Sequence, residues 1–204
     1  MKILKKQKNK KGSTLLEILF GISIFILIVV ALTLFSRNFW VYTSFISAGL
    51  DDADAGRQVI KTMVAEIRKA STANTGAYVI NLATASAFTF YSDIDNDTLK
   101  EKVRYFLSGN LLQKGVTKPT GSPLTYDVLN EKITTLVSNV TNSSIFDYYD
   151  TNYDGSTAPL SSPVAISSIR LIKITITKEK DPNRSPVPVT FSTQVSIRNL
   201  KDNL

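Results

Sequence analysis

The chain has 204 residues and a formal net charge of +7, and it contains neither cysteine nor histidine. This length is typical of about one domain. The lack of cysteine excludes a disulfide framework, a thiol nucleophile and a cysteine metal site. The lack of histidine removes the commonest general base and zinc ligand, although serine or carboxylate chemistry stays open.

The positive charge is concentrated at the N-terminus. Six lysines precede residue 13 with no acidic side chain among them: Lys2, Lys5, Lys6, Lys8, Lys10 and Lys11. Without these six, the chain keeps 18 of its 24 basic side chains against 17 acidic ones. Lysines beside an apolar segment are retained on the cytoplasmic side of a membrane, so we interpret them as a topological signal and not as a DNA-binding arm.

An apolar segment of 18 residues, Ile18–Phe35, follows with no charge and no proline. About 20 apolar residues in a helix cross the hydrocarbon core, and Arg37, Trp40 and Tyr42 suit the far interface. A cleaved secretory signal is the alternative, but its apolar region is shorter and ends in small residues. We therefore predict a single-pass helix in the cytoplasmic membrane, with the N-terminus in the cytoplasm.

The helical pattern continues beyond this segment. Apolar side chains recur on one stripe of a 3.6-residue helix at Val59, Ile60, Met63, Val64 and Ile67. We predict one long helix from about residue 14 to residue 72, with room for a bend between residues 49 and 56. Its first half lies in lipid, and its second half is amphipathic and needs a folded domain to cover the apolar side.

After Gly76 the apolar period changes to two, which is typical of strands. We expect a polar, turn-rich stretch at 147–163. Strands are expected at 78–82, 87–91, 102–107, 111–114, within 166–177 and within 187–198, and a short helix or turn in 128–137 is expected to lead into a strand near 136–140. A helix followed by antiparallel strands predicts an α+β fold. We therefore divide the chain into a basic leader (1–12), a transmembrane helix (13–42) and an extracytoplasmic α+β domain (43–204).

The junction between the lysines and the apolar segment carries a specific chemical pattern. Gly12 has no side chain to obstruct a protease at the membrane surface, and cleavage after it would leave a free amine on Ser13. Glu17 follows one helical turn later. An ionisable group in a bilayer costs at least about 2.5 kcal/mol, so we expect Glu17 to pair with its own N-terminal amine or that of a neighbouring subunit. The alternative is that Glu17 marks the interfacial end of an ordinary anchor.

The stretch Lys11–Glu17 (KGSTLLE) before an apolar helix resembles the class III signal of type IV prepilins and type II secretion pseudopilins. The resemblance implies a pilin-like fold, with the long helix packed on antiparallel sheet. It also implies cleavage after Gly12 by a membrane prepilin peptidase and N-methylation of the new terminus. Ser13 stands where the family usually has phenylalanine, a departure that bears on methylation more than on cleavage.

The later part of the chain resembles the J-type minor pseudopilins and the PilW-like minor pilins. The segments that carry this resemblance are 88–91, 103–105, 146–150 and 195–200. It implies a non-enzymatic structural subunit of a type IV pilus or a type II secretion pseudopilus, which moves from the inner membrane into an extracytoplasmic filament. The implied partners are other subunits, the prepilin peptidase, the inner-membrane assembly platform and, before assembly, membrane lipid.

Two rival functions stay open. A DNA-uptake pseudopilin would share the fold and differ in its partner, and a membrane-anchored enzyme or ligand-binding domain would share only the anchor. The basic positions Arg57, Lys61, Arg68 and Lys69 on the long helix suit a solvated face as well as they suit a nucleic acid, so we expect no nucleic-acid binding.

Two acidic loops resemble the first half of a calcium-binding loop. In the first, Asp150, Asn152 and Asp154 offer oxygen ligands at alternate positions before a glycine, although a serine stands at the twelfth position. We predict that calcium, if any cofactor binds, binds there. The second loop, Asp93–Asp97, has a threonine in place of the glycine and Arg104 at the twelfth position, so we expect a solvated turn.

Overall fold

The computed structural model describes residues 14–179 and 188–200. The chain divides into two compact units, Met1–Asp51 and Asp52–Leu204. Both residues of the expected cleavage site, Gly12 and Ser13, lie outside the described residues, as do most of the residues between the last two expected strands. The described elements are one long helix and two antiparallel sheets, which confirms the α+β class.

The long helix α1 spans Leu15–Arg68 and is continuous through the expected bend region. It begins at Leu15 because the Thr14 hydroxyl accepts a hydrogen bond from the backbone N–H of Glu17, at 3.3 Å. It ends before the expected residue 72. The amides of Lys69 and Ala70 bond three residues back, and the amide of Ser71 leaves the helix for a strand carbonyl.

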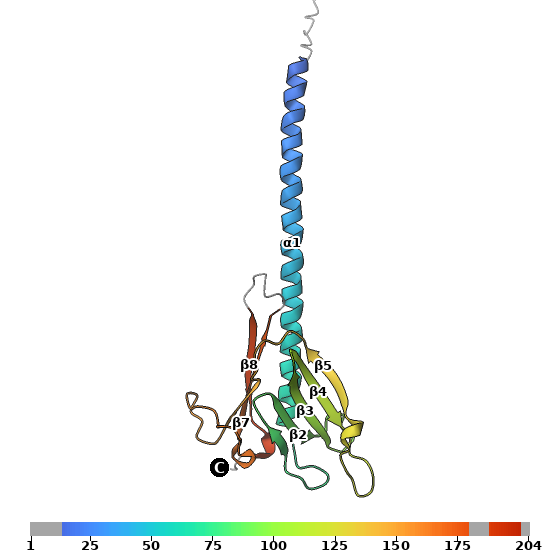
Figure 1. Cartoon of the computed structure of the whole chain (residues 1–204), viewed down its shortest axis with the longest axis vertical. Coiled ribbons are helices and arrows are strands. Elements are labelled where there is room, and N and C mark those ends of the chain that lie inside the picture. Colours follow the sequence, from blue (N-terminus) through green and yellow to red (C-terminus); the bar gives the residue numbers. More distant parts are fainter. Residues whose placement is uncertain (1–13, 180–187, 201–204) are drawn as a thin grey trace, which may run out of the picture. The chain divides into compact units, whose positions relative to one another are not determined.

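The first sheet is antiparallel, has five strands and follows chain order (Figure 1). Its strands are β1 (Ile80–Ala83), β2 (Ala87–Ser92), β3 (Glu101–Ser108), β4 (Leu111–Thr117) and β5 (Lys132–Val137). The expected hairpin between β3 and β4 is present, with Gly109 at a φ of 60° in the two-residue turn. A 3₁₀ helix, η1 (Val128–Asn130), precedes β5. The short helix is therefore confirmed, but the strand begins at Lys132 and not near residue 136.

The second sheet has three antiparallel strands, β6 (Phe146–Tyr149), β7 (Leu171–Lys178) and β8 (Val189–Val195), in that order. The 3₁₀ helices η2 (Ile166–Ser168) and η3 (Arg198–Leu200) lie before β7 and after β8. Strand β6 begins just before the stretch expected to be only turns and runs into it. It forms because its aromatic side chains enter the core and its backbone pairs with β7, a long-range contact.

The core of the second unit joins both sheets to the C-terminal turns of α1, which Figure 1 shows beside the strands. Met63 and Ile67 of the expected apolar stripe are fully buried. The Phe88 ring of the first sheet lies 5.9 Å from the Tyr148 ring of the second. The Tyr148 hydroxyl donates a hydrogen bond to the carbonyl of Thr84 at 2.8 Å. A folded domain therefore covers the amphipathic half of the helix, as the sequence predicts.

Candidate assembly helix and acidic cluster

The N-terminal part of α1 is long enough and apolar enough to cross a membrane. The span Leu15–Trp40 has 26 residues, its apolar stretch of 18 residues has a mean hydropathy of 3.0, and none of it is buried against other described parts of the chain. Leu15 is 84% exposed and Phe35 70%. A contiguous apolar surface of this extent is unfavourable in water and is typical of a membrane or protein contact.

Two hydroxyl groups inside this window, those of Ser23 and Thr33, bond to the helix itself. Ser23 donates to the carbonyl of Leu19 at 2.9 Å, and Thr33 donates to the carbonyl of Val29 at 2.7 Å. Bonds to the carbonyl four residues back satisfy a hydroxyl without water, so both side chains are compatible with lipid. The charged side chains of the window are then Glu17 at its start and Arg37 near its end.

Glu17 lies in the first turn of the helix and is exposed. A carboxylate is favoured there because the first-turn amides and the helix dipole present positive partial charge. The Thr14 hydroxyl accepts the hydrogen bond from the backbone N–H of Glu17, so this cap of the first turn does not use the Glu17 carboxylate. Pairing of Glu17 with the amine of Ser13 stays a prediction, since Ser13 lies outside the described residues.

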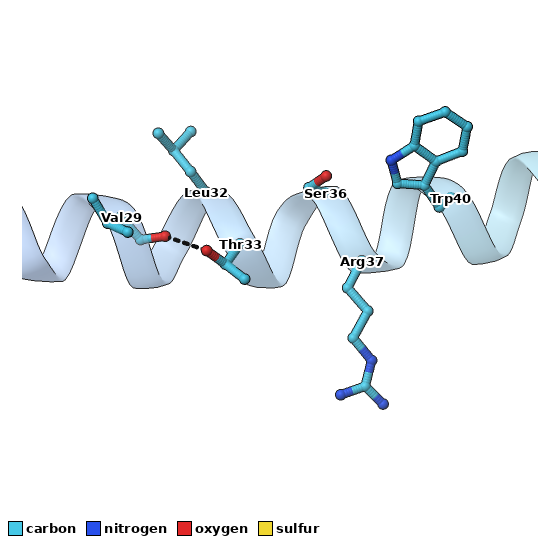
Figure 2. Close-up of a pocket in the computed structure, with 6 residues that line it drawn as sticks. All are labelled: Val29, Leu32, Thr33, Ser36, Arg37 and Trp40. Carbon is cyan, nitrogen blue, oxygen red and sulfur yellow. Dashed lines mark hydrogen bonds between the residues drawn. The ribbon is translucent and has the colours of Figure 1, made fainter.

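A shallow groove follows the far end of the window and is lined by Val29, Leu32, Thr33, Ser36, Arg37 and Trp40. Figure 2 shows Leu32, Ser36 and Trp40 along one side of the helix, while Arg37 points away from the opposite side. All the lining residues come from this one helix, so the helix alone encloses no ligand. The arrangement separates an apolar side with an aromatic end from a basic side chain, as expected near a membrane interface.

The expected calcium loop after β6 is held by its own hydrogen bonds. Asp150 Oδ1 accepts from the amide of Asn152 at 2.9 Å. Asp154 Oδ1 accepts from the hydroxyl and amide of both Ser156 and Thr157. These hydrogen bonds hold the pKa of Asp154 well below its usual range, and the bond from the Thr157 hydroxyl has the largest effect. Calcium binding by Asp150, Asn152 and Asp154 stays a prediction.

A different set of acids is brought together beside the first sheet, and we call it the acidic cluster. Carboxylate oxygens of Asp93, Asp95 and Glu101 all lie within 4.8 Å of one another. Asp93 and Asp95 belong to the loop after β2, and Glu101 opens β3 with a fully buried side chain. The expectation of a simple solvated turn is therefore wrong for Asp93, which is half-buried. Counting twelve positions from Asp93, as in a calcium-binding loop, leads to Arg104 and misses Glu101. Glu101 lies beside the loop because β2 pairs with β3, with Ser92 opposite Glu101.

Lys118, just beyond β4, is the cation beside the acidic cluster. Its ammonium contacts Asp95 and lies 3.1 Å from Asp97 Oδ2. Hydrogen bonds to these two carboxylates raise the pKa of Lys118. The pKa of Asp97 is lowered, mainly by the hydrogen bond from the Leu99 amide and next by the hydrogen bond from Lys118. Burial raises the pKa of Glu101, and the nearby carboxylates add to this effect.

Comparison with known proteins gives no further assignment. The sequence matches no family model and no curated protein.

Proposed function

We propose that this chain is a structural, non-enzymatic subunit of a type IV filament system, a minor pilin or pseudopilin. The subunit is stored in the cytoplasmic membrane through its N-terminal helix and is processed between Gly12 and Ser13. It then enters an extracytoplasmic filament, in which the apolar surface of the helix exchanges lipid contacts for contacts with neighbouring helices.

One observation supports this proposal most strongly. The exposed apolar window Leu15–Trp40 carries a single acidic side chain, Glu17, and that side chain lies in the first helical turn, just after the glycine and the lysines. An ordinary anchor has no need of a carboxylate at this depth. A carboxylate there is useful to a helix that must adopt one axial register among the packed helices of neighbouring subunits, because an unpaired carboxylate in an apolar helix bundle is strongly disfavoured.

The decisive experiment is intact-mass measurement of the full-length protein extracted from the membranes of its own host. We expect a mature chain that begins at Ser13, with or without one added methyl group. A protein that keeps residues 1–12 in a host with an active prepilin peptidase would overturn the proposal.

A pair of matched glycine variants makes the measurement specific. Gly12→Leu places a side chain at the expected cleavage site and should leave the leader attached. Gly21→Leu adds the same side chain inside the apolar window, where a β-carbon meets no described atom within 4 Å beyond the nearby backbone of its own helix, and should be cleaved normally. Equal processing of both variants would place any cleavage elsewhere in the chain.

A further inference from the structure

Two buried carboxylate oxygens in the acidic cluster accept no hydrogen bond from the part of the chain that the structure describes: Asp93 Oδ1 and Glu101 Oε1. The other oxygen of each group is satisfied, since Asp93 Oδ2 accepts from the amide of Thr98 and Glu101 Oε2 from the amide of Ile94, both at 3.0 Å. The Glu101 side chain has no exposed surface. A buried carboxylate oxygen without a partner is costly, so this pair of oxygens calls for a cation.

Lys118 does not supply that cation to both oxygens. Its ammonium lies 4.0 Å from Glu101 Oε1, which is too far for a hydrogen bond. Its hydrogen bonds go to Asp95 and Asp97. One ammonium therefore faces three carboxylates, those of Asp95, Asp97 and Glu101. Because the Lys118 side chain is 53% exposed, it can turn toward water without leaving a buried charge.

The spacing of the oxygens suits calcium. Calcium binds oxygen at about 2.3–2.6 Å, so ligands on opposite sides of the ion are about 4.6–5.2 Å apart, and those on adjacent sides are closer. Oxygens of Asp93, Asp95 and Glu101 within 4.8 Å of one another fit around one such ion. Magnesium requires shorter distances of about 2.0–2.1 Å and strict octahedral geometry, and it keeps most of its water.

We propose that the acidic cluster binds a calcium ion through Asp93, Asp95 and Glu101, with the Lys118 ammonium as the competing cation. The ion gives the two orphaned oxygens a ligand and joins the loop after β2 to the first residue of β3. Asp95 exchanges its contact with Lys118 for the metal. This site is separate from the Asp150 loop and does not depend on the filament proposal.

The test uses the full-length protein in detergent after removal of metal with EDTA. Calorimetric titration with calcium chloride and the melting temperature, in calcium and in EDTA, are the two measurements. We expect the unsubstituted protein to bind one calcium ion at the cluster and to melt at a higher temperature in calcium. Glu101→Gln keeps the shape of the side chain and should weaken calcium binding at least about tenfold. If Glu101→Gln fails to fold, Asp95→Asn, at an exposed position, replaces it as the test and should also weaken calcium binding.

Lys118→Met and Asp150→Asn sharpen the result. Lys118→Met removes the competing ammonium and should tighten calcium binding, an effect that damage to the fold would not produce. Asp150→Asn alters the other loop and should leave binding at the cluster unchanged. Absence of calcium binding, binding that Glu101→Gln and Asp95→Asn leave intact, binding lost only in Asp150→Asn, or equal stabilisation by magnesium would each overturn the proposal.

Discussion

The ammonium of Lys114 on β4 lies 2.7 Å from Glu66 Oε1 on α1, and both side chains are largely buried, at 16% and 15% exposure. The Tyr105 hydroxyl on β3 donates to the second oxygen of the same carboxylate at 2.6 Å. One helix carboxylate is thus shared by two strands of the five-stranded sheet. This network joins the last turns of α1 to the first sheet by polar contacts in addition to the apolar packing of Met63 and Ile67.

Lys114→Met should destabilise the folded domain by about 3 kcal/mol, because it leaves the Glu66 carboxylate mostly buried without its cation. The measurement is urea unfolding of the full-length protein in detergent. The control is Arg57→Ala, which breaks the exposed pair of Arg57 and Asp54 and should cost about 0.5 kcal/mol or less. Equal effects of the two substitutions would show that the Glu66–Lys114 pair adds nothing to stability.

Tyr105 should make the domain sensitive to alkali. Burial first, and then the charge of Glu66, raise the pKa of Tyr105 far above its ordinary value of 10.0. The unfolded chain therefore loses this proton at a lower pH than the folded chain does, so the stabilisation is complete below pH 10 and declines as the pH rises. Between pH 10 and 11, Tyr105→Phe should reduce this decline by about 1 kcal/mol. An unchanged pH profile of unfolding in the variant would contradict this account.

Gly115 leaves room for an ion pair across the first sheet. Glu131 reaches over Gly115 of β4 to Arg104 of β3, with two hydrogen bonds of 2.8 and 2.6 Å. A β-carbon at Gly115 would lie 2.1 Å from Glu131 Oε1. Gly115→Ala should therefore displace the carboxylate and destabilise the domain by about 1–3 kcal/mol, although alanine usually favours a strand over glycine.

A double-mutant cycle tests that explanation. In a Glu131→Ala background the carboxylate is gone, so Gly115→Ala should become neutral or stabilising. Unfolding in urea of the two single variants and the double variant gives the coupling. Additive effects of the two substitutions would mean that the cost at Gly115 has another origin.

Glu17→Ala should leave processing intact and impair assembly. Glu17→Ala leaves the proposed N-terminal amine unpaired among packed helices, and a charge in an apolar environment costs at least about 2.5 kcal/mol, so the amount recovered in sheared filaments should fall at least about tenfold. Ser23→Ala is the control, because the Ser23 hydroxyl bonds to the carbonyl of Leu19 in its own helix. Normal recovery of Glu17→Ala would remove the assembly role proposed for this residue.

Much of the fold follows from local pattern. The apolar run, the stripe at Met63 and Ile67, and the hairpin around Gly109 are properties of neighbouring residues, and the structure confirms the helix and strands that they predict. The sequence predicts the start of strand β5 too late in the chain. The first four side chains of β5 are exposed, so the sequence there lacks alternation between buried and exposed positions. Strand β6 was missed because only its partner β7 makes it a strand.

The sequence by itself determined that this protein has a basic N-terminus, an apolar helix with one early carboxylate, and an α+β domain without cysteine or histidine. Only the tertiary structure decided which acids meet. Glu101 joins Asp93 and Asp95 because the antiparallel pairing of β2 with β3 returns the chain to the start of its own loop. Glu66 meets Lys114 because the sheet folds against the helix. Such encounters depend on contacts between residues far apart in the chain, which no local pattern records.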